Sequence, residues 1–466
     1  MSSKAFAPFP IKTRAAGRQG SGAIAVVHIG GEEPAVVDAR FARRLEPTLH
    51  AVTSDPRISG VILCSDTPSH FAEGPKLAQL LEIDTEAGAD ALLEPSARVL
   101  LRLHAMPMPI VAVLDGVATG AGFELALACS GIVAAPRAAC SLATSMVGYL
   151  PGHHGLQALA SRLGPAEAAR IALAGETLSA TNLGALGLAS LSREDPFAEA
   201  ERLLGRAHTG VPRLRGHHRV TGRAALSLFR KRALAGACQH DVARERVFEL
   251  LHAFMTSGFT ASVALERHLA AELAIAHTTK RLVRHALSAN AERVTGDFGA
   301  RLQWAFIDEA RTLVAEGCDP HAVDAALVRW GFARGPLALA KELGPARMAE
   351  WNDRFARSTA DRFAAHVRPR PRPPSIEEMQ ARCVLRLVNE AQRCLAEGIV
   401  SDRMAADFTA TAVTSFPAFR SGPFAYADDL GHEFGDRLRV LERRFGARFA
   451  PARNAAEPAS FDAMKP

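Results

Sequence analysis

The amino-acid sequence predicts an α/β domain followed by an all-α region made of two similar helical halves. Apolar runs of strand length alternate with helical patterns in the first third of the chain. From about residue 200 onward, long Arg-, Ala- and Leu-rich helical patterns replace the strand signal. The last third contains an internal repeat on either side of a Pro- and Arg-rich stretch. These observations together indicate one mixed domain and one helical region.

The elements of the first third follow from the spacing of their apolar residues. The stretches AIAVVHI (23–29) and GVILCS (60–65) have the length of buried strands, and VDARFARRLEPTLHAV between them has helical spacing. IVAVLDG (110–116) predicts a further strand, which a Gly-rich turn and a helix follow. Residues 162–190 contain two short helical patterns separated by glycines. This alternation predicts an α/β domain over residues 1–195.

The rest of the chain has helical patterns with two interruptions. The patterns cover 224–237, 242–255 and 262–289, and VTGDFG (294–299) ends this series. RPRPRPPS (368–375) predicts a stiff, extended linker. Beyond the α/β domain we therefore expect a helical linker region at 196–295, a first helical unit at 296–368, a Pro/Arg linker at 369–375, a second helical unit at 376–453 and a tail at 454–466.

The internal repeat relates the two expected helical units. FIDEARTLVAEGCDPHAVDAALVRWGFARGPLALAKELG (306–344) matches LVNEAQRCLAEGIVSDRMAADFTATAVTSFPAFRSGPFAYADDLG (387–431). The matched positions are Glu309 and Glu390, Gly317 and Gly398, Asp324 and Asp407, Gly335-Pro336 and Gly422-Pro423, and Gly344 and Gly431. Repeats of this kind bury each other's apolar faces, so we expect two similar halves that pack together.

Composition and charge exclude several classes of protein. With 48% hydrophobic and 22% charged residues, the 466-residue chain has the composition of a soluble globular protein. Its formal net charge is +6, but no basic block is interleaved with aromatic residues, so we expect no nucleic-acid partner. The charge is compatible with anionic, phosphate-bearing small molecules.

Cysteine spacing and the N-terminal composition indicate a reducing compartment. The seven cysteines lie far apart without a C-x-x-C pair, which argues against disulfides and a zinc site. MSSKAFAPFPIKTR at the N-terminus lacks the continuous apolar stretch of a secretory signal. The most apolar stretch, 111–135, contains Asp115, Glu124 and several glycines, which is typical of a buried strand and helix. We expect a cytoplasmic protein with neither a transmembrane segment nor a metal site.

One acid, Glu124, stands at the strand-to-helix junction in DGVATGAGFELALACSG (115–131). A glutamate in the first turn of a helix commonly stabilises the helix dipole, by about 0.3–1 kcal/mol. A dinucleotide fingerprint is excluded, because Leu125 replaces the third glycine and no acid occurs between Glu124 and Glu167. The third interpretation is an oxyanion site, where the free N–H groups of the turn stabilise negative charge developing on a thioester oxygen.

The Gly-rich segment belongs to a longer stretch that resembles a known family. Residues 109–190, with the motifs GAGFELALA and GYLPG, are similar to the enoyl-CoA hydratase/isomerase (crotonase) family. DPRISGVILCSDTPSHFAEGPKLAQLLE (55–82) is similar to that family's first oxyanion segment. The resemblance implies a crotonase-type α/β spiral of ββα units that binds an acyl-CoA thioester.

The second half resembles the C-terminal helical domains of 3-hydroxyacyl-CoA dehydrogenases. With ELAIAHTTKRLV (272–283) before the break, the order of the parts resembles the α-subunit of fatty acid oxidation complexes. Between ANAERVTG and DFGARLQWAF, however, the family's NAD-binding Rossmann domain and its catalytic His–Glu pair are missing, and the family's Asn matches Ala300. Hydride transfer requires bound nicotinamide, so we expect no NAD, no other cofactor and no dehydrogenase activity.

The crotonase resemblance also implies which residues form the site. Glu124 matches one of the family's two catalytic carboxylates, and the backbone N–H groups of Glu73 and Ala121 match its oxyanion donors. The other carboxylate matches Thr144, four residues before the glycine of GYLPG. Hydration needs proton transfer at both Cα and Cβ, each contribution being worth about 10²–10⁴-fold. Because the family's isomerases generally keep their acid at the position of Thr144, Glu124 alone matches neither pattern.

His153 and His154 in PGHHG stand where the family has small residues. They are candidate substitute proton carriers, although a histidine at a helix start more often faces solvent. Two functions therefore remain: an atypical enoyl-CoA hydratase or isomerase of fatty-acid-like β-oxidation with Glu124 as base, or a catalytically silent acyl-CoA-binding or scaffold subunit of a β-oxidation complex. Because loss of the Rossmann domain would uncover apolar surface, we also expect a thiolase-like partner or self-association.

Overall fold

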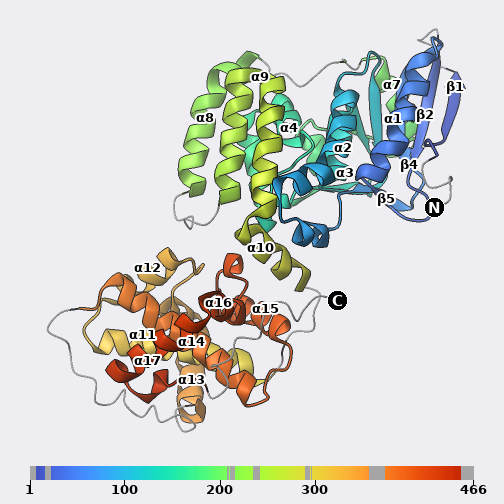
Figure 1. Cartoon of the computed structure of the whole chain (residues 1–466). Coiled ribbons are helices and arrows are strands. Elements are labelled where there is room, and N and C mark those ends of the chain that lie inside the picture. The colour runs from blue at the N-terminus through green and yellow to red at the C-terminus, as the bar shows by residue number, and fades with distance from the viewer. Residues whose placement is uncertain are drawn as a thin grey trace. The chain divides into compact units, whose positions relative to one another are not determined.

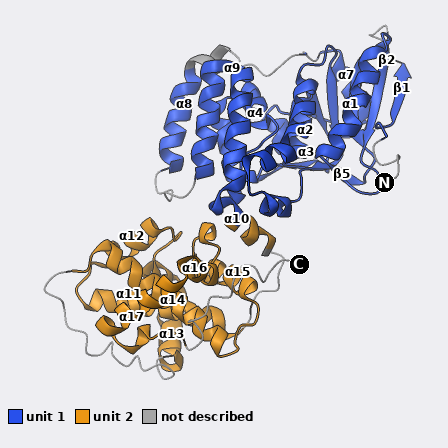
Figure 2. Cartoon of the chain, in the orientation of Figure 1, with its two compact units in different colours: residues 1–235, 241–280 blue, residues 236–240, 281–466 orange. Residues whose placement is uncertain are grey.

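The structure, a computed structural model, describes residues 7–15, 22–206, 209, 216–234, 242–288, 294, 296–355 and 373–452. The chain divides into two compact units, with residues 1–235 and 241–280 in unit 1 and residues 236–240 and 281–466 in unit 2 (Figure 2). Each unit has its own hydrophobic core.

Unit 1 is built on a six-stranded and a five-stranded sheet (Figure 1). The larger sheet has the order β1 (Ile11–Ala15), β2 (Ala23–Ile29), β4 (Ile58–Ser65), β6 (Ile110–Leu114), β8 (Gly131–Ala134) and β11 (Ser190–Leu191). The smaller sheet has the order β10 (Thr177–Ser179), β9 (Ala139–Ser141), β7 (Gly116–Thr119), β5 (Ser69–Glu73) and β3 (Ala35–Val36). The β1–β2 and β9–β10 pairs are antiparallel, and the other neighbours are parallel.

Successive strands enter the two sheets in turn, and a helix then returns the chain. β2 and β3 precede α1 (Ala39–Ser54), β4 and β5 precede α2 (Glu86–His104), and β6 and β7 precede α3 (Ala121–Ala128). Parallel strands require crossover connections of this kind. The short 3-10 helix η2 (Leu77–Glu82) lies between β5 and α2. This alternation confirms the predicted α/β spiral of ββα units.

Burial on both faces explains why the strand sequences are almost continuously apolar. Every residue of β6 is buried, as expected for a central strand of a covered parallel sheet. One face is covered by α7 (Pro196–Leu204), whose Ala200 and Leu204 pack with Ile62 and Val111 of the larger sheet. The first helix after residue 195 is therefore an integral layer of unit 1.

Further helices of unit 1 stand beside the sheets in Figure 1. They are α4 (Gly155–Leu163), α5 (Pro165–Ala174), α6 (Ala180–Ala185), α8 (Gly216–Leu234) and α9 (Val242–Ile275), and α10 (His277–Ser288) continues into unit 2. α9 is two helices joined at Gly258, whose φ of 83° breaks the helix, and it packs against α2, α4 and α5. Most of the expected linker region 196–295 thus lies inside unit 1, because these helices bury apolar faces there.

Among the described residues, α9 is the one helix whose length and composition would suffice to cross a membrane. Core helices of globular domains meet the same two criteria. Because α9 is divided at Gly258, neither of its segments reaches the roughly 20 residues that a spanning helix needs.

Unit 2 is helical, and its two halves follow one plan. The first half contains α11 (Asp297–Ala315), α12 (Pro320–Trp330) and α13 (Pro336–Phe355), and the second contains α14 (Ile376–Ala396), α15 (Arg403–Thr414), α16 (Pro423–Leu430) and α17 (His432–Phe445). α13 is broken at Gly344, and Gly431 separates α16 from α17 at the matched position, both glycines having positive φ. The two similar helical halves predicted from the repeat are confirmed.

Matched contacts show why the repeated residues are needed. Asp324 accepts hydrogen bonds from the first backbone N–H groups of α13, and Asp407 does the same for α16, at 2.7–3.0 Å. A Cβ at Gly335 or Gly422 would come within 2.2 or 2.5 Å of the respective aspartate side chain. Each glycine therefore leaves room for the carboxylate that caps the next helix.

Three sequence features lie wholly or partly outside the described residues. The tail at 454–466 lies outside them entirely. Of the Pro/Arg linker at 369–375 only the last three residues are described, and of the segment between α10 and α11 only Val294 and Gly296 are described.

Candidate functional site

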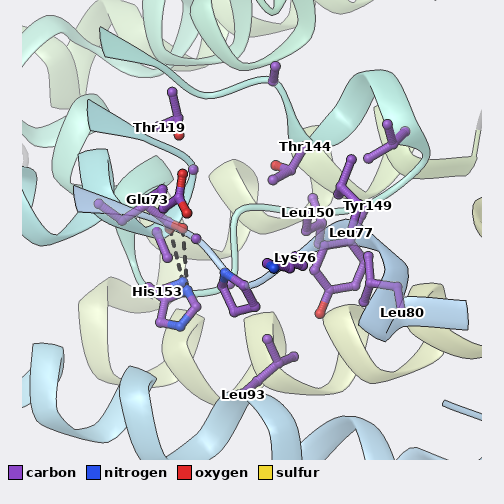
Figure 3. A pocket seen from close by; sticks show the side chains of 18 of the residues that line it. Glu73, Lys76, Leu77, Leu80, Leu93, Thr119, Thr144, Tyr149, Leu150 and His153 are labelled. Atoms are coloured by element: carbon purple, nitrogen blue, oxygen red, sulfur yellow. Dashed lines mark hydrogen bonds and ion pairs between the residues drawn. The ribbon is translucent and has the colours of Figure 1, made fainter. Parts of the chain in front are cut away.

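A cavity of about 440 Å³ lies in unit 1, where the ends of β5, β7 and β9 meet the start of α3 and the loop before α4. Of the residues singled out from the sequence, it is lined by Glu73, Ala121, Glu124, Thr144 and His153. Much of the remaining lining is apolar, including Leu77, Leu80, Leu93 and Leu150 (Figure 3). His154 does not line this cavity.

The turn before α3 places an open helix N-terminus at the cavity. Gly120 adopts φ 52°, which favours glycine, and no side chain caps the helix that begins at Ala121. The Ala121 N–H has no acceptor within the helix, since the first N–H groups of a helix never do. Gly74 lies over this amide, and a Cβ on it would come within 3.2 Å of the Ala121 nitrogen. The small residue at 74 thus leaves the amide open.

Close packing fixes this helix start against β5. A Cβ on Gly122 would lie 1.9 Å from the Ala72 carbonyl oxygen and 2.6 Å from the Glu73 nitrogen. Only glycine permits this approach, and it brings the backbone of Glu73 next to the first turn of α3. The two segments that the resemblance assigned as oxyanion donors are therefore neighbours. Their role as donors remains a prediction.

Glu124 lies one turn into α3 with 1% of its surface exposed. Its Oε1 accepts hydrogen bonds from the backbone N–H groups of His153 (2.9 Å) and Gly155 (3.0 Å). Its Oε2 lies 3.4 Å from Nδ1 of His153. Burial alone would raise the pKa of Glu124, but the hydrogen bond and charge of His153, with the two N–H groups, hold this pKa below its ordinary value. The buried carboxylate is therefore ionised at neutral pH.

His153 links Glu124 to a hydroxyl on α2. Its Nε2 lies 2.8 Å from Oγ of Ser96, and the Ser96 hydroxyl also donates to the Leu93 carbonyl at 3.1 Å. His153 is buried and lines the cavity, and the dashed lines in Figure 3 mark its contacts with the carboxylate of Glu124. The expectation that a histidine at this helix start faces solvent is wrong for His153, because the start of α4 is buried against α2 and α3.

His154 faces a second cavity, of about 260 Å³, that α2 and α9 line. Its Nδ1 lies 2.6 Å from Oε2 of Glu266, and its Nε2 lies 3.3 Å from the Ala97 carbonyl oxygen. Burial alone would lower the pKa of His154, but the charge and hydrogen bond of Glu266 raise it above its ordinary value. His154, buried like its neighbour, is thus a charged partner of a buried acid on α9. Its distance from Glu266 in the sequence hid this pair from sequence reasoning.

Two hydroxyl groups at the first cavity have no partner among the described residues. They are Oγ1 of Thr144, in the 3-10 helix η3 (Thr144–Val147), and the hydroxyl of Tyr149. Burial, helped by the charges of Glu124 and Glu266, raises the pKa of Tyr149, so its hydroxyl stays protonated. Sequence reasoning missed Tyr149, because only the fold places it at the cavity. Thr144 offers a hydroxyl where the family resemblance leads one to expect an acid.

The described residues contain no group of three or more His, Cys, Asp or Glu side chains that could hold a metal ion. The first cavity presents Glu73, Lys76, Glu124, His153, several hydroxyl groups and the open amide of Ala121. A buried, ionised carboxylate beside an uncapped helix N-terminus can move a proton while the amide stabilises the resulting negative charge.

Comparison with known proteins finds one family match in each unit. Residues 21–203 match the family model described as enoyl-CoA hydratase/isomerase. Residues 296–377 match the model described as 3-hydroxyacyl-CoA dehydrogenase, C-terminal domain. The two matches fall on the spiral of unit 1 and on the first helical half of unit 2 with the start of α14.

Solved structures similar to this chain include three enoyl-CoA hydratases or hydratase/isomerases. The enzyme from Rhodobacter sphaeroides 2.4.1 is 16% identical, with 59% of this chain and 89% of that chain covered and a TM-score of 0.44. The protein from Mycobacterium paratuberculosis is 19% identical, with 59% and 98% covered and a TM-score of 0.42. The enzyme from Bacillus halodurans is 18% identical, with 59% and 98% covered and a TM-score of 0.40.

Proposed function

We propose that this chain, whose residues 21–203 form an enoyl-CoA hydratase/isomerase domain joined to a dehydrogenase C-terminal domain, is an atypical enoyl-CoA hydratase or isomerase. Its substrate is an acyl-CoA thioester of fatty-acid-like β-oxidation. One observation carries the proposal: the ionised, buried Glu124 lines the same apolar cavity as the uncapped Ala121 amide. That pairing supports a reaction in which a carboxylate moves a proton and an amide holds an enolate oxygen.

The reaction begins with the thioester carbonyl oxygen at the Ala121 N–H. In hydration, water adds to Cβ while its proton passes to Oε2 of Glu124, because Oε1 already accepts two backbone hydrogen bonds. The electron pair of the Cα=Cβ bond moves to the carbonyl oxygen. The amide and the positive end of the α3 dipole stabilise this enolate. A proton taken from solvent and delivered to Cα completes the 3-hydroxyacyl product, and Glu124 returns its proton to solvent.

His153 keeps Glu124 ready for this role. The imidazole beside Oε2 lowers the pKa of the carboxylate, so that Glu124 is ionised before each turnover. The chain from Glu124 through His153 to Ser96 also fixes the orientation of the imidazole. His153 therefore acts as a positioning residue, and His154, which faces the other cavity, stabilises the loop that carries both histidines.

The proposal leaves out dehydrogenation and NAD. At the position of the family's Asn, α11 carries Ala300, which is packed against the core of unit 2 and has no group to polarise a substrate. For unit 2 we propose an assembly role in the cytoplasm, through a thiolase-like partner or a second copy of the chain. Light scattering of the pure chain and co-purification from the source cell test this role.

The second candidate, a silent acyl-CoA-binding or scaffold subunit, is favoured by one observation. Thr144 holds a hydroxyl where the family's second acid would stand. A hydroxyl cannot take up a proton at neutral pH, so a site with Glu124 alone would bind a thioester without completing hydration.

The deciding experiment measures turnover by the full chain with crotonyl-CoA and with 3-hexenoyl-CoA, followed by loss or gain of enoyl absorbance. We expect turnover of one of them, and Glu124→Gln should lower it by about 10²–10⁴-fold. Gln retains an Oε1 that accepts the His153 and Gly155 N–H groups, so the melting temperature should change little. Saturable binding of both thioesters without turnover would instead establish the silent subunit.

A further inference from the structure

We propose that the carboxylate of Glu73 transfers the proton at Cα of the bound thioester, in place of the acid missing at Thr144. The sequence resemblance assigns only the backbone N–H of Glu73 a role. The inference rests on the proposed function, because it needs a thioester in the first cavity. It adds a second proton-transferring group and hence the capacity for complete hydration.

The backbone of Glu73 is held firmly at the end of β5. Its carbonyl oxygen accepts a hydrogen bond from Val37 N–H at 2.8 Å, and β3 and β7 flank the strand on both sides. Gly122 packs directly on the Ala72–Glu73 peptide. A side chain at this position therefore starts from a fixed point beside the first turn of α3.

The Glu73 side chain lines the cavity and is not engaged elsewhere. Figure 3 shows it on the same side of the cavity as His153, with Tyr149, Leu77 and Leu80 on the opposite side. Among the described residues, the Glu73 carboxylate has no hydrogen-bond or ion-pair partner, whereas Oε1 of Glu124 already accepts two backbone N–H groups. A carboxylate left unpaired in a largely apolar cavity is available to a ligand.

The other polar groups of the cavity do not fit the role. Glu73 and Glu124 are the acids among its lining residues. The hydroxyl groups of Thr119, Ser141, Thr144 and Tyr149 cannot act as a base toward Cα, and Lys76 has no acceptor with which to take up its proton. His153 already contacts both Glu124 and Ser96. Of the two carboxylates that line the cavity, only Glu124 is engaged in the contacts described above, so Glu73 is the one left for a ligand.

Reach and chemistry agree with this assignment. The Glu73 peptide packs on the first turn of α3, and Glu73 and Ala121 line the same cavity, so the side chain starts next to the amide that would hold the thioester oxygen. The Glu73 carboxylate removes a proton from Cα, the C–H electron pair forms the enolate, and the negative charge moves to the oxygen held by the amide. The reverse step returns the proton from the carboxylic acid to Cα. In hydration, Glu124 takes the proton of water, Glu73 gives one to Cα, and solvent restores both groups.

The test separates the two carboxylates by two readouts. Butyryl-CoA has no double bond, so exchange of its Cα protons in D₂O, followed by NMR, reports only the Cα step. We expect exchange with the wild-type chain and a loss of about 10²-fold or more in Glu73→Gln and Glu73→Ala, both of which keep the backbone N–H. Glu124→Gln should retain the exchange while losing hydration of crotonyl-CoA. Glu82→Gln, an exposed acid of η2 outside the cavity lining, is the matched control.

Two results would overturn the inference: no Cα exchange by the wild-type chain, or wild-type exchange rates in both Glu73 variants. Because the Glu73 carboxylate makes no contact that stabilises the fold, both variants should melt at the wild-type temperature, so a loss of exchange is not a folding effect. Failure of the proposed function gives a different result, namely Cα exchange that depends on Glu73 without turnover of either enoyl-CoA.

Discussion

The buried acids of the two units have different pairing partners: histidines in unit 1 and arginines in unit 2. In unit 1, Glu124 and Glu266 pair with the adjacent histidines of one loop, and each pair borders a cavity. In unit 2, the matched acids Glu309 and Glu390 pair with arginines, the carboxylate of Glu309 lying 2.6 Å from Arg382. All four carboxylates are almost fully buried.

The partner decides what a buried acid can do. Arginine keeps its proton at any pH that a protein survives, so the acids of unit 2 stay locked in permanent ion pairs. Histidine exchanges protons near neutral pH, so the acids of unit 1 can take part in proton transfer. Burial of an acid therefore does not by itself indicate catalysis. A buried acid becomes a candidate for catalysis when its partner is titratable and a cavity adjoins the pair.

The ion pairs of unit 2 also repeat across its pseudo-symmetric halves. Arg301 of α11 contacts Glu390 of α14 and Glu397 just after it, and Arg382 of α14 contacts the matched Glu309 of α11 and Glu316 just after it. Each half thus supplies one arginine to the acids of the other half, and Glu390 also pairs with Arg386 and Arg393 of its own helix. This exchange ties α11 to α14 and fixes their register, which gives these residues a structural role.

The largest expected effect comes from breaking one of these arginine pairs. Arg382→Met leaves Glu309 and Glu316 buried with one cation fewer, and should lower the free energy of unfolding of unit 2 by about 3–5 kcal/mol. The three tryptophans, at 304, 330 and 351, all lie in unit 2, so their fluorescence during urea unfolding reports this unit alone.

The matched control for that variant is Arg444→Met, which removes an exposed pair with Glu378 at 2.9 Å. It should cost at most about 1 kcal/mol. Turnover of crotonyl-CoA by unit 1 should survive both substitutions in the absence of denaturant. Equal stability of the two variants would remove the distinction between buried and exposed pairs in unit 2.

A smaller effect is expected when the carboxylate of Glu73 is replaced by one at position 144 of the cavity. Thr144→Glu placed in the Glu73→Gln background supplies a carboxylate from another segment of the cavity lining, and should raise the rate of crotonyl-CoA hydration by a factor of about 10². The comparison is between initial rates of the single and the double variant. A folded double variant that hydrates no faster than Glu73→Gln would show that position 144 no longer faces the reacting carbon.

The smallest effect is a pH dependence in the histidine pair. The folded-state pKa of His154 is raised above its ordinary value of 6.5. Its contribution to stability is therefore complete below about pH 6.5 and is lost as the pH rises through the folded-state pKa, at roughly 1.4 kcal/mol per pKa unit. His104 nearby does not add to this, because burial and the charges of His154 and Arg162 lower its pKa to about 3.

His154→Asn tests this sign, since asparagine tolerates the left-handed backbone at φ 69°. The difference in unfolding free energy between wild type and variant, followed by circular dichroism, should be largest near pH 6 and shrink toward pH 9. Arg382→Met should show no such trend in tryptophan fluorescence. If His154→Asn lowers the unfolding free energy by the same amount at every pH, the His154–Glu266 pair behaves like the permanent ion pairs of unit 2 and the predicted pH dependence is wrong.

Several features were available from the sequence because they depend on local pattern. Alternating apolar runs predicted the α/β domain of unit 1, whose spiral of ββα units the family resemblance implied. The matched Gly, Asp and Gly-Pro positions predicted the two halves of unit 2. The Gly-rich turn at 120–122 and Glu124 in the following helix were predicted together, since the backbone of a turn is specified by the residues within it. The order of the elements and the place of Glu124 after the turn could thus be predicted from the sequence.

Only the tertiary structure decided which side chains meet. It turned the adjacent His153 and His154 toward different cavities, paired His154 with Glu266 from a helix that the sequence had placed in a linker region, and left the Glu73 carboxylate unpaired in the cavity. The physical reason is that local spacing fixes backbone conformation, whereas the partner of a buried charge is set by long-range packing. Proton transfer by a buried acid depends on that partner. The residue pattern of the sequence therefore predicts the fold, whereas the partners of the buried acids are known only from the tertiary structure.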